Sequence, residues 1–88
     1  MTFHVYILLL GNNQLYTGFT GDLDRRVSEH RRGNVASTAK RQPVELIHYE
    51  TYKLESDARR RERFLKTTEG KRLLRQQLRD VLAKHGVI

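Results

Sequence analysis

An arginine and a histidine share the apolar face of one predicted helix in this chain. Counting from Leu23, the i+3, i+4 and i+7 positions are Arg26, Val27 and His30, so both polar side chains point the same way as the apolar ones. A guanidinium binds phosphate or carboxylate oxygens, and an imidazole transfers protons near neutral pH. An unpaired buried charge is costly, which leaves two interpretations of Arg26 open. It pairs with a carboxylate beside a hydrogen-bonded histidine, or it faces a cleft that holds an anion.

Two tyrosines and a glycine precede that helix on a predicted β-hairpin. If residues 11–13, "GNN", form a three-residue loop, Tyr6 lies opposite Gly18 and diagonal to Tyr16 on one face of the sheet. A loop of two or four residues would move Tyr16 to the other face. In this register Gly18 leaves the area in front of Tyr6 without a side chain, as the close approach of a ligand requires. The alternative is a pair of core tyrosines with their hydroxyls at the rim.

A single glutamate, Glu62, lies among four arginines in a predicted helix near the C-terminus. It follows Ala58 by one helical turn and so borders the apolar side of that helix. One interpretation is a charge that balances its neighbours on a solvated face. The other is a ligand for a hard cation at the edge of a cleft, because Mg²⁺ prefers carboxylate oxygens.

Composition limits the classes of function. The chain has 88 residues, which we expect to form one domain, 1–88, and it contains no cysteine for disulfides or thiolate metal sites. The apolar run at residues 5–10 is too short for a signal peptide or a membrane span, so we expect a cytoplasmic protein with no membrane partner. The net charge of +7 and pI near 10.3 favour a nucleic-acid partner over a merely solvated basic surface. No Walker loop, zinc-type histidine spacing or nucleophile motif is present.

The elements that position these residues follow from periodicity and turn signals. Strands are expected at residues 3–10, 14–19 and 44–52, and an exposed basic loop at residues 34–43. Helices are expected after the caps Asp22, Ser56 and Thr68, the first ending at Gly33 and the last at Gly86. The order ββαβαα predicts a small α/β sandwich. Its three-stranded antiparallel sheet has the first strand in the centre and is packed by three helices.

These segments together resemble the GIY-YIG nuclease domain, and the small stand-alone bacterial members in particular. "HVY" at residues 4–6 and "YTG" at 16–18 stand where the family has Gly-Ile-Tyr and Tyr-Ile-Gly. "TGDLDRRVSEH" at 20–30 matches the family's run of Asp-Leu, Arg and His, and "RQPVELIHYE" at 41–50 matches its Pro-then-strand segment. "ARRRERFLK" at 58–66 matches the helix with the metal-binding glutamate. The resemblance covers about residues 3–75.

The resemblance implies roles for five side chains. Glu62 would hold one Mg²⁺ or Mn²⁺ at the scissile phosphate. Tyr16, helped by Tyr6 or His30, would position and deprotonate the attacking water, and Arg26 would neutralise charge on phosphorus. The chain departs from the family in three ways. His4 replaces the first glycine, Phe19 stands where the excision-repair members have a lysine, and no asparagine follows Glu62.

The leading hypothesis is a metal-dependent endonuclease that hydrolyses DNA, with RNA not excluded, in DNA repair or processing. With no separate recognition domain in 88 residues, it would respond to DNA structure rather than sequence. The alternative is a nucleic-acid-binding module of the same fold with little or no catalysis. Either would use Lys40, Arg41 and Arg60 to contact the nucleic acid. A third possibility, of another class, is a protein-interaction domain that uses its helical face.

Overall fold

Three strands and four helices make up the protein in a computed structural model that describes residues 1–87. The elements are β1 (Phe3–Leu9), β2 (Leu15–Thr20), α1 (Leu23–Arg31), β3 (Glu45–Tyr52), α2 (Glu55–Leu65), α3 (Thr68–Gln77) and α4 (Arg79–Lys84). Both strand pairs are antiparallel, in the sheet order β2-β1-β3. This confirms the predicted α/β class, the element order and the central place of the first strand.

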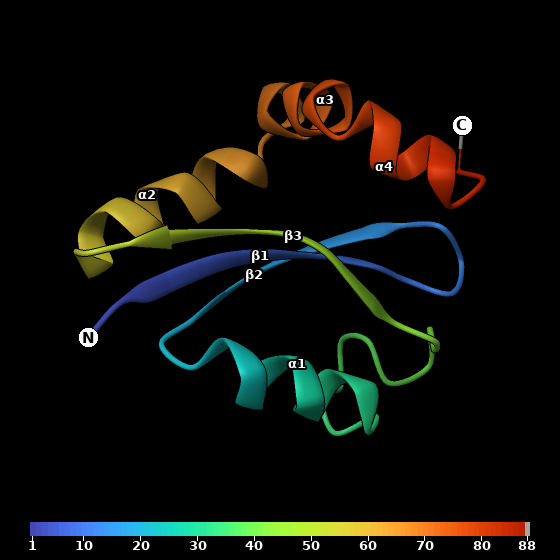
Figure 1. The fold of residues 1–88 in the computed structure, drawn as a ribbon, viewed down its shortest axis with the longest axis horizontal. Helices are drawn as coiled ribbons and strands as arrows, with labels where there is room; N and C mark the ends of the chain where they lie inside the picture. Colours follow the sequence, from blue (N-terminus) through green and yellow to red (C-terminus); the bar gives the residue numbers. More distant parts are fainter. Residues whose placement is uncertain (88) are drawn as a thin grey trace.

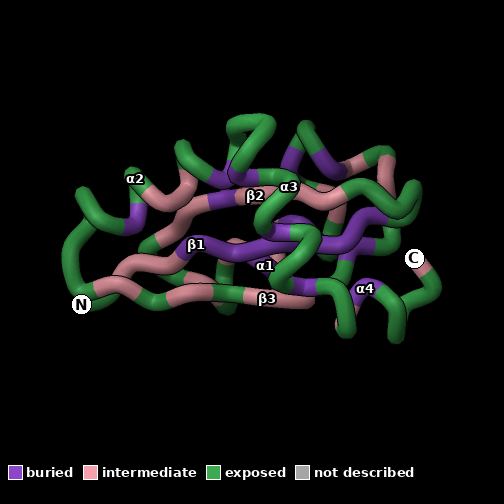
Figure 2. Tube along the Cα trace, turned by 90° about the horizontal axis from the view of Figure 1, so that it is seen from above, coloured by how far each residue is buried: buried purple, intermediate pink, exposed green. Residues whose placement is uncertain are grey.

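The sheet is covered on both faces, which explains why β1 is apolar along most of its length. Helix α1 lies on one face, and α2, α3 and α4 lie on the other (Figure 1). Val5 and Ile7 pack toward α2, α3 and α4, whereas Leu8 and Leu10 belong to a second cluster with Leu23 of α1. Figure 2 shows β1 buried between β2 and β3. The two outer strands are left to form the edges of the sheet.

Three local expectations were wrong. Helix α2 begins two residues earlier than expected, with Leu54 at the N-cap and no side-chain cap, so Ser56 does not cap it. Thr67, rather than Thr68, caps α3 by accepting a hydrogen bond from the Gly70 amide. The C-terminal helix is divided at Leu78, which ends α3 and precedes α4. Leucine spacing continues across this division, so periodicity alone could not show it.

The loop before β3 is more buried than its composition indicates. Residues 34–43 contain exposed basic side chains, but Val35 is 8% exposed and Thr38 is completely buried. The backbone amides of Thr38, Ala39 and Arg41 donate hydrogen bonds to carbonyls within the segment, which folds it into consecutive turns. The loop therefore packs beneath the sheet beside α1 and contributes to the interior.

None of the helices in residues 1–87 has the length and apolar character that a membrane span requires.

Candidate active site

The β1–β2 hairpin brings the two motif tyrosines together. Leu10 and Gln14 close the loop, with Asn13 at a φ of 68°, and Tyr6 pairs with Gly18 while Leu8 pairs with Tyr16. This is the predicted register. The rings of Tyr6 and Tyr16 consequently lie on one face, with centroids 6.3 Å apart.

Gly18 accommodates the Tyr6 ring. A Cβ at position 18 would lie 2.2 Å from Cζ of Tyr6 and 2.3 Å from its hydroxyl oxygen. The expectation that Gly18 keeps a gap open for a ligand is therefore wrong, because the side chain of Tyr6 fills that space. The glycine instead lets this side chain cross the edge strand.

Helix α1 adds the arginine and the histidine. Asp22 caps it by accepting a hydrogen bond from the Arg25 amide at 3.2 Å, as predicted, and Val27 anchors it to the sheet. The His30 ring then packs edge-on against both tyrosines, with centroids 5.6 Å from Tyr6 and 5.1 Å from Tyr16. We call Tyr6, Tyr16, Arg26 and His30 the edge cluster, because they gather at β2.

His30 is held by hydrogen bonds on both ring nitrogens. Its Nε2 lies 2.9 Å from the Tyr6 hydroxyl, and its Nδ1 lies 2.7 Å from Oγ1 of Thr38. Thr38 donates its own hydroxyl proton to the Val35 carbonyl, so its oxygen accepts the Nδ1 proton. The Nε2 lone pair is then free to accept a hydrogen bond from Tyr6. Sequence reasoning missed Thr38, because nothing in its loop distinguishes a buried hydroxyl from an exposed one.

Burial favours the neutral forms of His30 and Tyr6. The pKa of His30 is lowered by burial and, to a smaller degree, by the positive charge of Arg26. Burial raises the pKa of Tyr6, although interaction with Arg26 opposes this shift. His30 is 0% and Tyr6 is 1% exposed, so neither can contact a substrate directly in this conformation. They can act through Tyr16 and Arg26, which are both partly exposed.

Arg26 has a carboxylate partner on its own helix. Its guanidinium donates to Oε1 of Glu29 at 3.2 Å, and its side chain is 38% exposed. The first interpretation of Arg26, an ion pair beside a hydrogen-bonded histidine, therefore describes the contacts within the chain. An ion pair with this exposure contributes little stability and can exchange for a phosphate oxygen.

Helix α2 places Glu62 on the side of the sheet opposite α1. Arg59, one turn earlier, stacks on the Phe19 ring of β2 with Cζ 3.9 Å from the centroid. Glu62 accepts a hydrogen bond from Lys66 at 3.1 Å, and its side chain is 15% exposed. Its charge is close enough to contribute to the raised pKa of Tyr6. The carboxylate and the edge cluster thus approach β2 from opposite faces.

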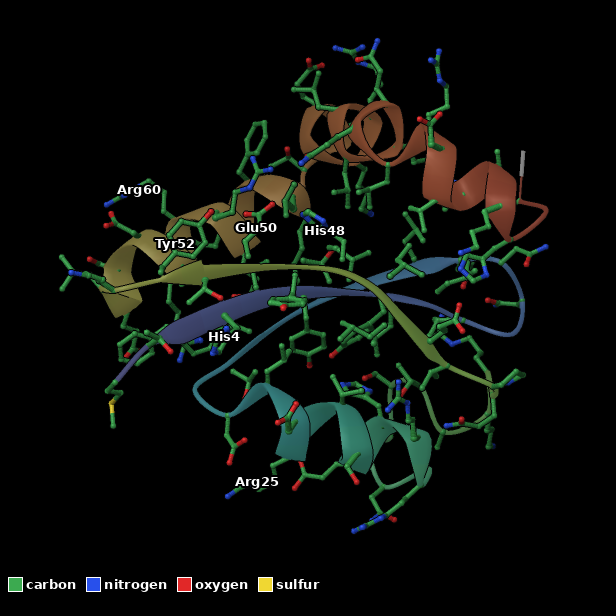
Figure 3. All side chains as sticks on the ribbon, viewed as in Figure 1. His4, Arg25, His48, Glu50, Tyr52 and Arg60 are labelled. Carbon is green, nitrogen blue, oxygen red and sulfur yellow. The ribbon has the colours of Figure 1, made fainter. Side chains whose placement is uncertain are left out.

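A partly buried ion pair joins α2 to β3. Glu50 of β3 accepts hydrogen bonds from Arg61 at 2.9 and 3.2 Å and from the Tyr52 hydroxyl at 2.7 Å, and its other neighbour is His48 at 3.0 Å. Figure 3 shows Glu50, Tyr52 and His48 between β3 and α2. Burial alone would raise the pKa of Glu50, but these hydrogen bonds lower it to about 2.

A model of the GIY-YIG catalytic domain matches residues 2–76. The chain belongs to the GIY-YIG family. It is 41% identical over 81 residues to a UPF0213 protein of Haloquadratum walsbyi, covering 89% of this chain and 91% of that one. A UPF0213 protein of Staphylococcus aureus is 40% identical over 72 residues, or 81% and 88% of the two chains. The family is of nuclease type, as the sequence motifs predicted.

Two solved structures resemble this GIY-YIG domain. The solution structure of a UPF0213 protein from Bacillus halodurans has a TM-score of 0.57 and 31% identity, and the match covers 88% of this chain and 85% of that one. A solution structure from E. faecalis has a TM-score of 0.56 and 33% identity, with coverages of 89% and 88%. The fold of the small members is therefore shared over most of the chain.

The donor set of this GIY-YIG domain fits a cation that is bound together with substrate. Residues 1–87 contain no group of three or more His, Asp or Glu side chains that could enclose a metal. Glu62 offers one carboxylate, which is 15% exposed, whereas the similarly shielded Glu50 is already paired with Arg61. Mg²⁺ keeps several waters and is commonly held by one or two carboxylates plus substrate phosphates. One carboxylate beside a basic surface fits that mode of binding and does not fit a tightly enclosed structural metal.

Of the three residues predicted to contact nucleic acid, two lie in the loop before β3 and the third lies on α2. Lys40 is exposed on the loop before β3. Arg41 donates to Gln14 at 2.8 Å and to the Ser37 carbonyl, so it ties this loop to the hairpin. Arg60 points outward from α2 (Figure 3) and pairs with Asp57 at 2.9 Å. The structure does not bring these three cations together.

Proposed function

We propose that this protein is a divalent-metal-dependent endonuclease that hydrolyses DNA phosphodiester bonds in repair or processing, directed by DNA structure rather than by sequence. The observation that carries the proposal is the arrangement at β2. Tyr16 and Arg26 lie with the buried Tyr6–His30 pair on one face of the sheet, and Glu62 approaches from the other.

The exposed and the buried side chains of the site have different roles in this proposal. Tyr16, partly exposed, orients the attacking water and helps to deprotonate it. Arg26 exchanges Glu29 for the phosphate and stabilises the charge that develops on its oxygens. The Tyr6–His30 pair packs against Tyr16 and holds its ring in place. Glu62 would hold Mg²⁺ or Mn²⁺, which when bound acts as a Lewis acid toward the phosphate.

The second candidate is a binding module of the same fold with little or no catalysis. It is favoured by the net charge of +7, which by itself supports phosphate contact without any chemistry. A DNA cleavage assay distinguishes the two candidate functions.

A panel of nicked and branched DNA substrates, incubated with Mg²⁺ or Mn²⁺, tests the proposal. We expect cleavage by the wild type. Glu62→Gln should lose nearly all of it, Tyr16→Phe about 10²–10⁴-fold and Arg26→Ala about 10²–10³-fold. Glu69→Gln is the matched control, because it removes an exposed carboxylate that pairs with an arginine on α3. Thermal melting checks that each variant is folded. Absence of cleavage by the wild type with both metals, or cleavage by Glu62→Gln equal to that by Glu69→Gln, would refute the nuclease.

A further inference from the structure

A basic groove runs along the outer edge of β2, next to the candidate active site. It has a volume of about 410 Å³ and is lined by residues 14–17 of the hairpin and by Lys66, Lys71, Leu74 and Arg75. Strand β2 is an edge strand, so no further strand of the sheet covers this side. The groove thus has one wall of strand and one wall of helix, with three cations on the helical wall.

The two cations of α3 are held in place by how that helix packs. A Cβ at Gly70 would lie 1.9 Å from the Phe64 carbonyl oxygen, so the start of α3 is in direct contact with the end of α2. Leu74 is 2% exposed and fixes the helix in the core. Lys71 and Arg75, which are four residues apart, therefore share one side of α3 and face the same groove.

These cations are available for a ligand. No ion pair within residues 1–87 involves Lys71 or Arg75, and both are exposed. Arg72, on the same helix, differs from Lys71 and Arg75 because it is paired with Glu69. Lys66 is paired with Glu62 at 3.1 Å but is 55% exposed. A cation bound at Glu62 would release the Lys66 ammonium for a third contact.

The groove is continuous with the candidate active site. Tyr16 lines it and also packs against His30, and Lys66 lines it and also contacts Glu62. A chain of phosphates whose scissile member lies between Tyr16 and Glu62 would therefore enter the groove directly. The polar side chains of Gln14 and Thr17 on the strand wall provide hydrogen bonds without adding negative charge.

We propose that this groove binds the phosphate backbone of a polynucleotide on one side of the scissile phosphate, with Lys71 and Arg75 as the main anchors. The inference rests on the proposed function for the identity of the scissile site. It adds a specific path for the substrate, which none of Lys40, Arg41 and Arg60 defines.

Binding without cleavage tests the groove. A fluorescent nicked DNA duplex is titrated with protein in EDTA, and anisotropy is measured between 50 and 200 mM salt. Lys71→Ala/Arg75→Ala should reduce the slope of log K against log salt by about 2 and weaken binding about 50-fold at 0.1 M salt. The control, Arg32→Ala/Lys53→Ala, removes one arginine and one lysine from exposed positions at the C-cap of α1 and in the β3–α2 turn. We expect it to change both quantities much less.

The outcomes separate the two proposals. If the two double variants have equal salt slopes and the wild type binds and cleaves DNA, the proposed role of the groove is wrong. The proposal of a nuclease then still holds. A wild type that binds through Lys71 and Arg75 but never cleaves would support the groove and refute catalysis. A wild type that does not bind DNA at all would overturn both.

Discussion

Replacing Gly18 by alanine should displace the buried tyrosine on which the edge cluster is built. The new Cβ would lie 2.2 Å from Cζ of Tyr6 and 2.3 Å from its oxygen. The ring cannot move aside cheaply, because it is 1% exposed and its hydroxyl is 2.9 Å from Nε2 of His30. Without this clash, alanine in a strand should stabilise the protein by about 0.5–1 kcal/mol relative to glycine. The expected sign is therefore opposite to that of the intrinsic preference.

The size of the effect follows from two losses. Forcing extra volume into a packed site costs about 1–3 kcal/mol. Separating Tyr6 from His30 leaves buried polar groups unsatisfied, at about 1–3 kcal/mol more. With the strand preference acting in the opposite direction, we expect Gly18→Ala to lower the free energy of unfolding by about 1–5 kcal/mol. A domain of this length has about 4–13 kcal/mol in total, so the loss is a large share.

Urea denaturation and thermal melting measure this loss, and Gly21→Ala is the control. No atom lies within 4 Å of a Cβ at position 21, and its φ is not in the positive region, so that variant should stay within about 0.5 kcal/mol of wild type. In a Tyr6→Leu background, which removes the ring, Gly18→Ala should cost less than about 1 kcal/mol. Equal stability of the Gly18 and Gly21 variants, or an undiminished cost of Gly18→Ala after Tyr6→Leu, would contradict the packing described here.

Two further predictions concern the hydrogen bonds of Glu50 and Thr38. Because the pKa of Glu50 is lowered from 4.5 to about 2, its stabilising contribution is complete above about pH 5 and is lost as the pH falls toward 2. The loss is at most about 3 kcal/mol. Urea titrations at several pH values should show this acid-dependent loss in wild type and a weaker one in Glu50→Gln, and equal pH dependence would count against the Arg61 pair. Thr38→Val leaves the Nδ1 proton of His30 without an acceptor and should cost about 1–3 kcal/mol, measured by thermal melting. Thr38→Ser keeps the acceptor and should cost less, whereas an equal loss would show that the hydroxyl does not matter.

The sequence was sufficient for most of the fold because its signals are local. Alternating and helical periodicities located the strands and helices, and the "GNN" loop defined the hairpin register that the structure confirms. Ser56 failed as a cap because α2 begins after Leu54, which is 61% exposed, so that Ser56 lies within the first turn of the helix. The division at Leu78 escaped detection because no glycine or proline marks it.

The candidate site was predictable where residues share an element and less so where they meet across elements. Helical spacing placed Arg26 and His30 on one face, and strand pairing placed Tyr6 near Tyr16. The burial of Thr38 depends on how a loop folds beneath the sheet, which no periodic pattern encodes. The role of Gly18 likewise became visible only with the position of a side chain from the neighbouring strand.

The position of β2 at the edge of the sheet also bears on the risk of self-association. An edge strand exposes unpaired backbone N–H and C=O groups that can pair with the edge of another molecule, and charged side chains, lysine above all, discourage such pairing. Lys66, Lys71 and Arg75 lie beside this edge and would repel the same cations of a second copy. Replacing these cations by neutral residues would therefore weaken phosphate binding in the groove and would also remove a barrier to edge-to-edge aggregation.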